Sequence, residues 1–72
     1  MQNSIHNKEY KAIIERLKKA RMEAGLTQVD VADILGKPQS YISKIESGER
    51  RLDVLELKRL IKIYKKPASY FL

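Results

Sequence analysis

Seventy-two residues form one domain at most, and a chain of this length buries only a small core. The sequence has no Cys and a single His, which excludes disulfides, thiolate metal sites and His-paired catalytic triads, so we expect no metal, no cofactor and no enzymatic activity. Fifteen Lys and Arg against nine Asp and Glu give a net charge of +6, an electrostatic bias toward polyanions that selects no particular partner by itself.

The chain begins with a polar segment and continues into a helical pattern. Residues 1–7 show no period and are interpreted as a flexible arm whose last residue, Asn7, caps the helix that follows. Residues 8–24 place apolar side chains at three- and four-residue intervals, which predicts a helix that Gly25 ends. A folded domain is therefore expected over residues 8–72.

A second helix is predicted over residues 28–35. Thr27 precedes a new apolar period and is followed three residues later by Asp30, a pattern typical of a capping box. Gly36 supplies the break after the last apolar residue.

A third helix is predicted over residues 38–47. Pro38 presets the backbone angle of its first turn, and Gly48 ends it. No alternating strand pattern occurs in the sequence.

A fourth helix is predicted over residues 53–64, where Asp53 and Glu56 repeat the capping pattern and Pro67 is the stop. The tail, residues 68–72, has the length of one further turn. Its aromatic and leucine side chains are expected either to complete the core or to contact a second copy of the chain.

The second and third predicted helices have the features of a helix-turn-helix. Ile42 and Ile45 of the later helix face the earlier one across the turn at Gly36. Only a small residue such as Ala32 lets the two axes approach closely at a steep angle. Polar residues are left on the outer face of the later helix.

The chain resembles the XRE-type, lambda-repressor-like helix-turn-helix family from about residue 9 to its end. The segments that carry the resemblance are Leu26-Thr27-Gln28, Val31-Ala32, Leu35-Gly36 and the stretch from Gln39 to Gly48. The resemblance implies an all-α, five-helix DNA-binding domain in which the third helix is the recognition helix.

The resemblance also implies which side chains face base edges. They lie at the start and on the outer face of the third helix: Gln39, Ser40, Tyr41, Ser43 and Lys44. Glutamine can pair with adenine through two hydrogen bonds, serine discriminates less, and lysine can reach a guanine or a phosphate. The alternative is that these are only exposed polar residues.

Four further residues are expected to contact phosphates, Gln28, Lys37, Arg50 and Arg51, although the family often has an aliphatic residue at the position of Lys37. Gln28 begins the second helix, where free amides and the helix dipole favour an anion. The two arginines follow the third helix, and the alternatives for them are a cap on that helix or a pair with Asp53. Family members also pair the positions of Arg21 and Glu46 in a partly buried salt bridge, so these two are interpreted as structural.

The resemblance implies a sequence-specific transcriptional regulator, a repressor or controller, that binds a palindromic double-stranded DNA operator as a homodimer. The apolar runs are too short to span a membrane and no secretion signal occurs, so a cytoplasmic, bacterial or phage nucleoid location is expected. No small-molecule substrate is evident. The alternative is a protein-interaction adaptor on the same scaffold, such as an antitoxin or a coactivator-like protein.

Overall fold

The computed structural model describes residues 7–72, and within this range the chain forms four α-helices and no strand. The elements are α1 (Lys8–Glu23), α2 (Gln28–Leu35), α3 (Gln39–Ser47), α4 (Val54–Tyr64) and the short 3-10 helix η2 (Ala68–Tyr70). The predicted all-α fold is confirmed. The five-helix count that the resemblance implies is not confirmed, because four α-helices form and the tail, expected as one further turn, is a single 3-10 turn. The expected flexible arm lies outside the described residues except for Asn7.

Side-chain caps begin three of the four α-helices, as the sequence predicts. The Oδ1 atom of Asn7 accepts a hydrogen bond from a first-turn amide of α1 at 2.7 Å. Thr27 and Asp30 form a reciprocal capping box at α2, with hydrogen bonds of 3.0 and 2.8 Å. Asp53 and Glu56 do the same at α4, at 2.8 and 2.9 Å. These bonds satisfy amides that have no acceptor within the helix.

Three residues predicted as helical ends are instead the flanking caps: Ala24, Pro38 and Asp53. Pro38 has extended backbone angles and offers no side-chain acceptor, so α3 begins at Gln39 without a side-chain cap. Helix α4 ends at Tyr64, as predicted, and Lys65 takes a left-handed conformation two residues before Pro67.

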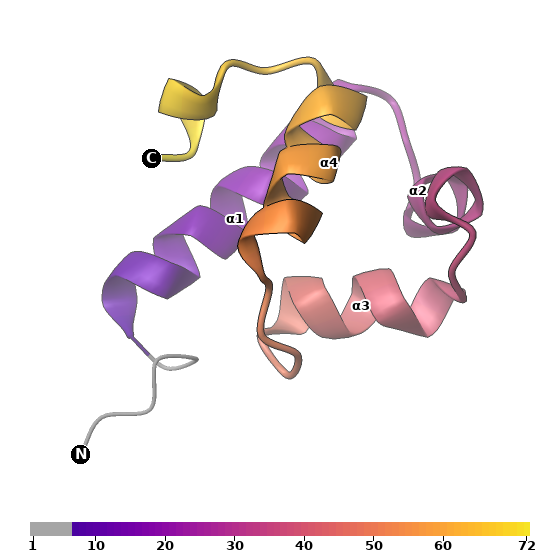
Figure 1. Ribbon diagram of the computed structural model, residues 1–72, viewed down its shortest axis with the longest axis horizontal. Helices are drawn as coiled ribbons and strands as arrows, with labels where there is room; N and C mark the ends of the chain where they lie inside the picture. The colour runs from indigo at the N-terminus through magenta and orange to yellow at the C-terminus, as the bar shows by residue number, and fades with distance from the viewer. Residues whose placement is uncertain (1–6) are drawn as a thin grey trace.

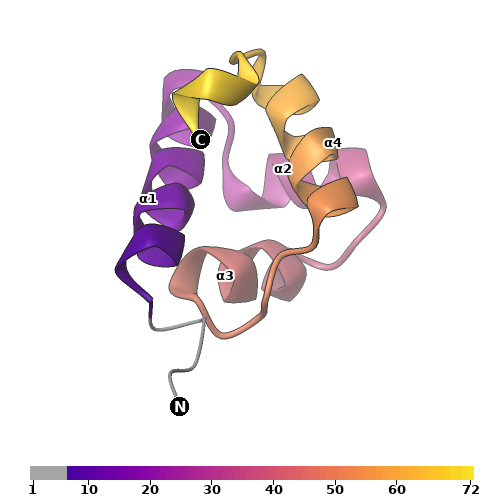
Figure 2. The same cartoon turned by 60° about the vertical axis from the view of Figure 1, so that its left-hand side comes forward.

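The core lies where α1, α2, α3 and α4 meet. Figure 1 shows α3 below α4, and Figure 2 shows it beside the lower ends of α1 and α4. The seam between α2 and α3 is closed, because Ala32, Ile42 and Ile45 are each only 1% exposed. Gly36 makes the turn between these helices with a φ of +68°, a conformation that favours glycine. The buried apolar residues are Ile14, Leu17, Ala20, Val31, Ala32, Ile42, Ile45, Leu60, Tyr64 and Phe71.

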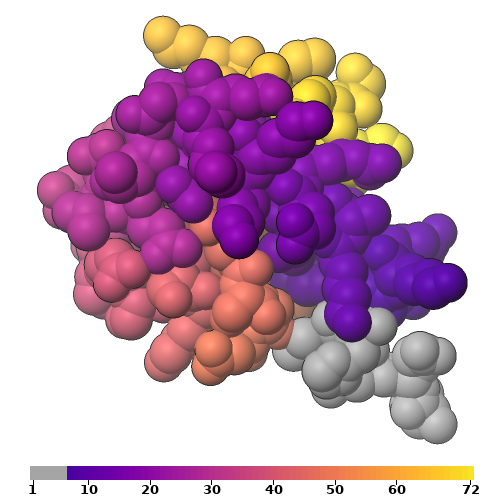
Figure 3. All heavy atoms as spheres, turned by 180° about the vertical axis from the view of Figure 1, so that it is seen from behind, coloured from indigo at the N-terminus to yellow at the C-terminus, as the bar shows by residue number. Residues whose placement is uncertain are grey.

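The C-terminal tail folds back toward α1, as Figures 2 and 3 show. Phe71 is fully buried and its carbonyl accepts a hydrogen bond from Arg16 of α1 at 3.3 Å. Leu72 remains 75% exposed. Phe71 therefore completes the core, as one of the two expectations for the tail had it, and Leu72 does not.

The close approach of α2 and α3 gives a first prediction. Replacing Ala32 by Leu places three extra carbons in a filled seam, and overpacking of this kind costs about 1–3 kcal/mol. We expect urea denaturation to give a lower free energy of unfolding for Ala32→Leu, while Ala68→Leu, at an exposed position, changes it little. Equal stability of the two variants would show that the seam has spare room.

Candidate nucleic-acid interface

The outer face of α3 carries the polar side chains that the sequence analysis singled out. Ile42 and Ile45 point into the core on the inner face. On the opposite side, Gln39, Ser40 and Lys44 are exposed and Ser43 is partly exposed. Four of the five expected base-reading side chains therefore lie together on one accessible face, as the helical period requires.

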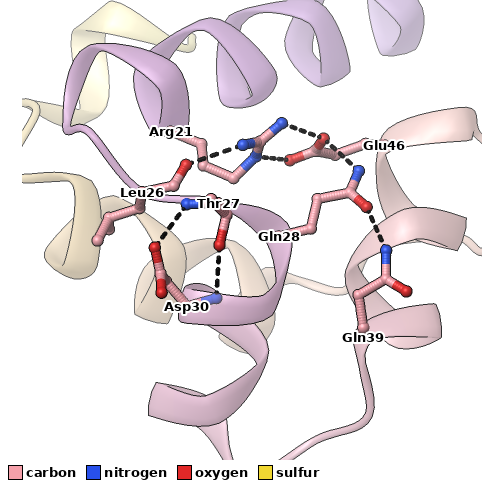
Figure 4. A network of polar contacts seen from close by, with 7 residues as sticks. All are labelled: Arg21, Leu26, Thr27, Gln28, Asp30, Gln39 and Glu46. Atoms are coloured by element: carbon pink, nitrogen blue, oxygen red, sulfur yellow. Dashed lines mark hydrogen bonds and ion pairs between the residues drawn. The ribbon is translucent and has the colours of Figure 1, made fainter.

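A buried carboxylate connects this face to the interior (Figure 4). The Oε2 atom of Glu46 accepts from Arg21 Nε at 2.7 Å, and its Oε1 accepts from Arg21 Nη2 at 3.0 Å. The two side chains are 5% and 11% exposed, so the pair is largely shielded from water. Arg21 also donates to the carbonyl of Leu26 at 2.8 Å. The residues expected to form the structural salt bridge are thus in two-point contact.

The same carboxylate orients two glutamine side chains in succession. Gln28 Nε2 donates to Glu46 Oε1 at 3.0 Å, and Gln28 Oε1 accepts from Gln39 Nε2 at 2.7 Å (Figure 4). A carboxylate only accepts hydrogen bonds, so the amide nitrogen of Gln28 must face it and its oxygen must face Gln39. The chain of contacts therefore fixes which way the amide of Gln39 points.

Tyr41 lies differently from the other expected base-reading residues. It is partly buried, and its hydroxyl donates to Glu56 of α4 instead of facing outward from α3. Burial first, and then the Glu56 carboxylate, raise the pKa of Tyr41 to about 12, so the phenol stays protonated and can donate. Tyr41 therefore lies at the boundary between α3 and α4 and not on the face expected to read bases.

A comparison with family models agrees with this geometry. The model described as helix-turn-helix matches residues 17–71, which include all of α2, α3 and α4. The chain belongs to the helix-turn-helix family. The family is the XRE, lambda-repressor-like one that the sequence resembles, and its members bind DNA. No curated protein matches the chain closely enough to count as a relative.

Within this helix-turn-helix domain, Arg50 caps α3 through its backbone, because its N–H donates to the carbonyl of Lys44 at 3.1 Å, while its side chain pairs with Glu56. Its Nη1 atom lies 2.9 and 3.0 Å from the two carboxylate oxygens of Glu56, and it donates to the carbonyl of Arg51 at 3.2 Å. Asp53 is not its partner because the carboxylate of Asp53 caps α4. The pair with Glu56 is partly exposed, with 40% of the Arg50 side chain accessible.

The other residues expected to contact phosphates border the same face of the helix-turn-helix. Lys37 is exposed in the turn before α3, and Arg51 is exposed in the connection after it. Gln28 opens α2, but its side chain is engaged with Glu46 and Gln39. The roles of these residues toward DNA stay predictions.

Sequence reasoning missed Glu56 as a functional residue. The spacing from Asp53 identified it only as half of a capping box, which it is. The same carboxylate also holds Tyr41 and Arg50, which come from α3 and the connection after it. No local signal reveals this second role, because these partners lie six and fifteen residues away in the sequence.

A hollow of about 570 Å³ lies elsewhere, between α1 and the end of α3. Its lining includes Tyr10, Ile14, Glu15 and Glu49, and none of the residues expected to contact bases or phosphates. Within residues 7–72, no group of three metal-ligating side chains comes together. Over the same range, no helix has the length and apolar character needed to cross a membrane.

The buried pair of Arg21 and Glu46 gives a second prediction. Removing one partner leaves an uncompensated charge in the interior, so Glu46→Ala should lower the free energy of unfolding by about 3 kcal/mol. Glu23→Ala is the matched control, because it removes an exposed ion pair with Lys66 and should have a much smaller effect. Equal losses in urea denaturation would contradict the structural role of Glu46.

Glu56 gives a third prediction, on pH dependence. Burial by itself would raise the pKa of this carboxyl, but hydrogen bonds from the Asp53 backbone, Tyr41 and Arg50 together lower it. A lowered pKa stabilises the fold above the unfolded value of about 4.3, and this contribution is lost as the pH falls through the folded value.

Thermal unfolding between about pH 6 and about pH 2.5 tests this linkage. We expect the Tm of the natural chain to fall more steeply on the acid side than that of Glu56→Gln, which cannot titrate. Glutamine still serves the capping box at this position, so the cap is kept. Parallel Tm curves would contradict a stabilising Glu56 carboxylate.

Proposed function

We propose that this chain is a sequence-specific, double-stranded DNA-binding regulator of transcription, a repressor or controller, and that α3 reads the major groove. The observation that carries the proposal is the exposed Gln39 at the start of α3, held by Gln28 at 2.7 Å. The major groove admits an α-helix, and the first residues of a recognition helix are those that contact base edges.

The hydrogen bonds of Gln39 favour an adenine. One N–H of its amide nitrogen is donated to Gln28, which leaves the second N–H and the amide oxygen for a ligand. Adenine presents the matching pair in the major groove, an N7 acceptor beside an N6 donor. Because Gln28 and Glu46 orient this amide before DNA arrives, little side-chain entropy is lost on binding.

The remaining polar residues of the outer face extend the contact. Ser40 and Ser43 offer hydroxyls that donate or accept, and Lys44 offers a cation to a guanine or a phosphate. The backbone contacts of the proposal come from Gln28, Lys37, Arg50 and Arg51. The second N–H of the Gln28 amide and the free amides that open α2 are available to a phosphate.

The proposal includes a homodimer on a palindromic operator. Two copies reading equivalent half-sites about 34 Å apart would place both recognition helices on the same side of the duplex. The burial of Phe71 removes this residue from any contact between copies. The proposed place of action is bacterial or phage DNA in the cytoplasm.

Selection of bound duplexes from a random DNA pool tests the function. A preferred sequence with two-fold symmetry is expected, and its affinity should fall steeply with salt as phosphate contacts release counterions. A preferred sequence without symmetry would contradict the dimer. The absence of any preferred duplex would contradict sequence-specific binding and favour the adaptor function instead.

The division between base and phosphate contacts gives a fourth prediction. Gln39→Ala should relax discrimination at one base position of the selected duplex, at a cost of about 1–3 kcal/mol against the correct base. Arg50→Ala should weaken the selected and a scrambled duplex by the same factor. Lys62→Ala, which removes an exposed cation from α4, is the control for net charge. Identical effects of Gln39→Ala on both duplexes would exclude base reading by Gln39.

A further inference from the structure

Two cations from the two ends of α3 lie over one aromatic ring. Lys37 precedes α3, and its Nζ lies 5.4 Å from the centre of the Tyr41 ring. Arg50 follows α3, and its guanidinium carbon lies 4.7 Å from the same centre. Both distances fall within the range in which a ring face attracts a cation. The ring therefore contacts one cation from each of the two segments that flank α3.

The ring of Tyr41 is itself held in place. Its hydroxyl donates to Glu56, a residue of a different helix that is fixed by its own capping bond to Asp53. The side chain of Glu56 is only 12% exposed, and Tyr41 is partly buried. A tyrosine fixed at both its backbone and its hydroxyl presents its ring in one orientation.

Arg50 is held in a way that leaves most of its donors available. Its contacts with Glu56 and with the carbonyl of Arg51 are all made by Nη1. Within residues 7–72, its Nε and Nη2 groups make no hydrogen bond, although a guanidinium has five N–H donors. With 40% of the side chain exposed, these donors can meet an anion without breaking the contacts that position Arg50.

We propose that Tyr41 is a positioning residue whose ring holds Lys37 and Arg50 as a clamp for two phosphates of the DNA backbone beside α3. This assignment rests on the DNA binding proposed above. Lysine and arginine lose much rotamer freedom when they bind, so cations that are already placed bind phosphate more tightly. Tyr41 in this role sets the affinity for every duplex and selects no base.

Substitution of Tyr41 in the full chain tests the clamp. Fluorescence anisotropy would give the affinity of each variant for the selected and the scrambled duplex over a series of salt concentrations. Tyr41→Leu should weaken both duplexes by the same factor and make the salt slope shallower by up to about 1.8, the value for two lost phosphates. Tyr41→Phe keeps the ring but loses the hydroxyl that fixes it, so its salt slope should lie between those of the natural chain and Tyr41→Leu.

Tyr70 provides a matched control. Lys66 lies 4.8 Å from the centre of the Tyr70 ring, so Tyr70→Leu also removes a ring beneath a lysine. This ring belongs to the tail, which lies at the other end of the molecule from α3 (Figures 1 and 2). Tyr70→Leu should leave the salt slope unchanged. Circular dichroism checks that each variant is folded, and Tyr41→Met replaces Tyr41→Leu if the latter is not.

Each result decides for or against the clamp. A larger loss on the selected duplex than on the scrambled one would show that Tyr41 reads a base, and an unchanged salt slope would show that it positions neither cation. A natural chain that prefers no duplex would overturn the proposed function instead. In that case the clamp is still tested by the salt slopes of the natural chain and of Tyr41→Leu on the scrambled duplex, which has the same phosphates.

Discussion

The carboxylate of Glu46 contacts side chains from two other helices, and the position of α3 depends on it. It lies near the end of α3, receives two hydrogen bonds from Arg21 of α1, and receives a third from Gln28 of α2. A carboxylate this well shielded is costly unless its oxygens are paired. Because these three donors come from fixed points on two helices, the pairing also specifies where α3 lies relative to them.

The local signals of the sequence predicted the helices well. Helix α2 has the predicted bounds, since Thr27 and Asp30 interact across three residues and Gly36 supplies the left-handed turn. Such interactions depend on near neighbours and are visible in the sequence. The five-helix count implied by the resemblance was not confirmed, because the five-residue tail is too short for a full α-helix and forms one 3-10 turn before the buried Phe71.

The candidate site was predictable only in part. The outward position of Gln39, Ser40 and Lys44 follows from the helical period once Ile42 and Ile45 are assigned to the core. The helical period does not predict the hydrogen-bond partners of Tyr41 and Arg50. Several carboxylates lie near Arg50 along the chain, and the folded position of Glu56, beside Arg50 and Tyr41, selects it. The partners of long side chains depend on the tertiary structure, and residue spacing in the sequence does not predict them.

Glu46 and Glu56 lie close to the surface that is proposed to bind DNA. Their presence there needs an explanation, because uncompensated negative charge would repel the phosphates. Glu46 is paired with Arg21 and Glu56 with Arg50, so neither adds net negative charge to the interface. Each carboxylate supplies a fixed hydrogen-bond acceptor. Glu46 orients the amide of Gln39 through Gln28, and Glu56 holds the hydroxyl of Tyr41. The groups proposed to face bases and those proposed to face phosphates are thus each ordered by one buried or half-buried ion pair.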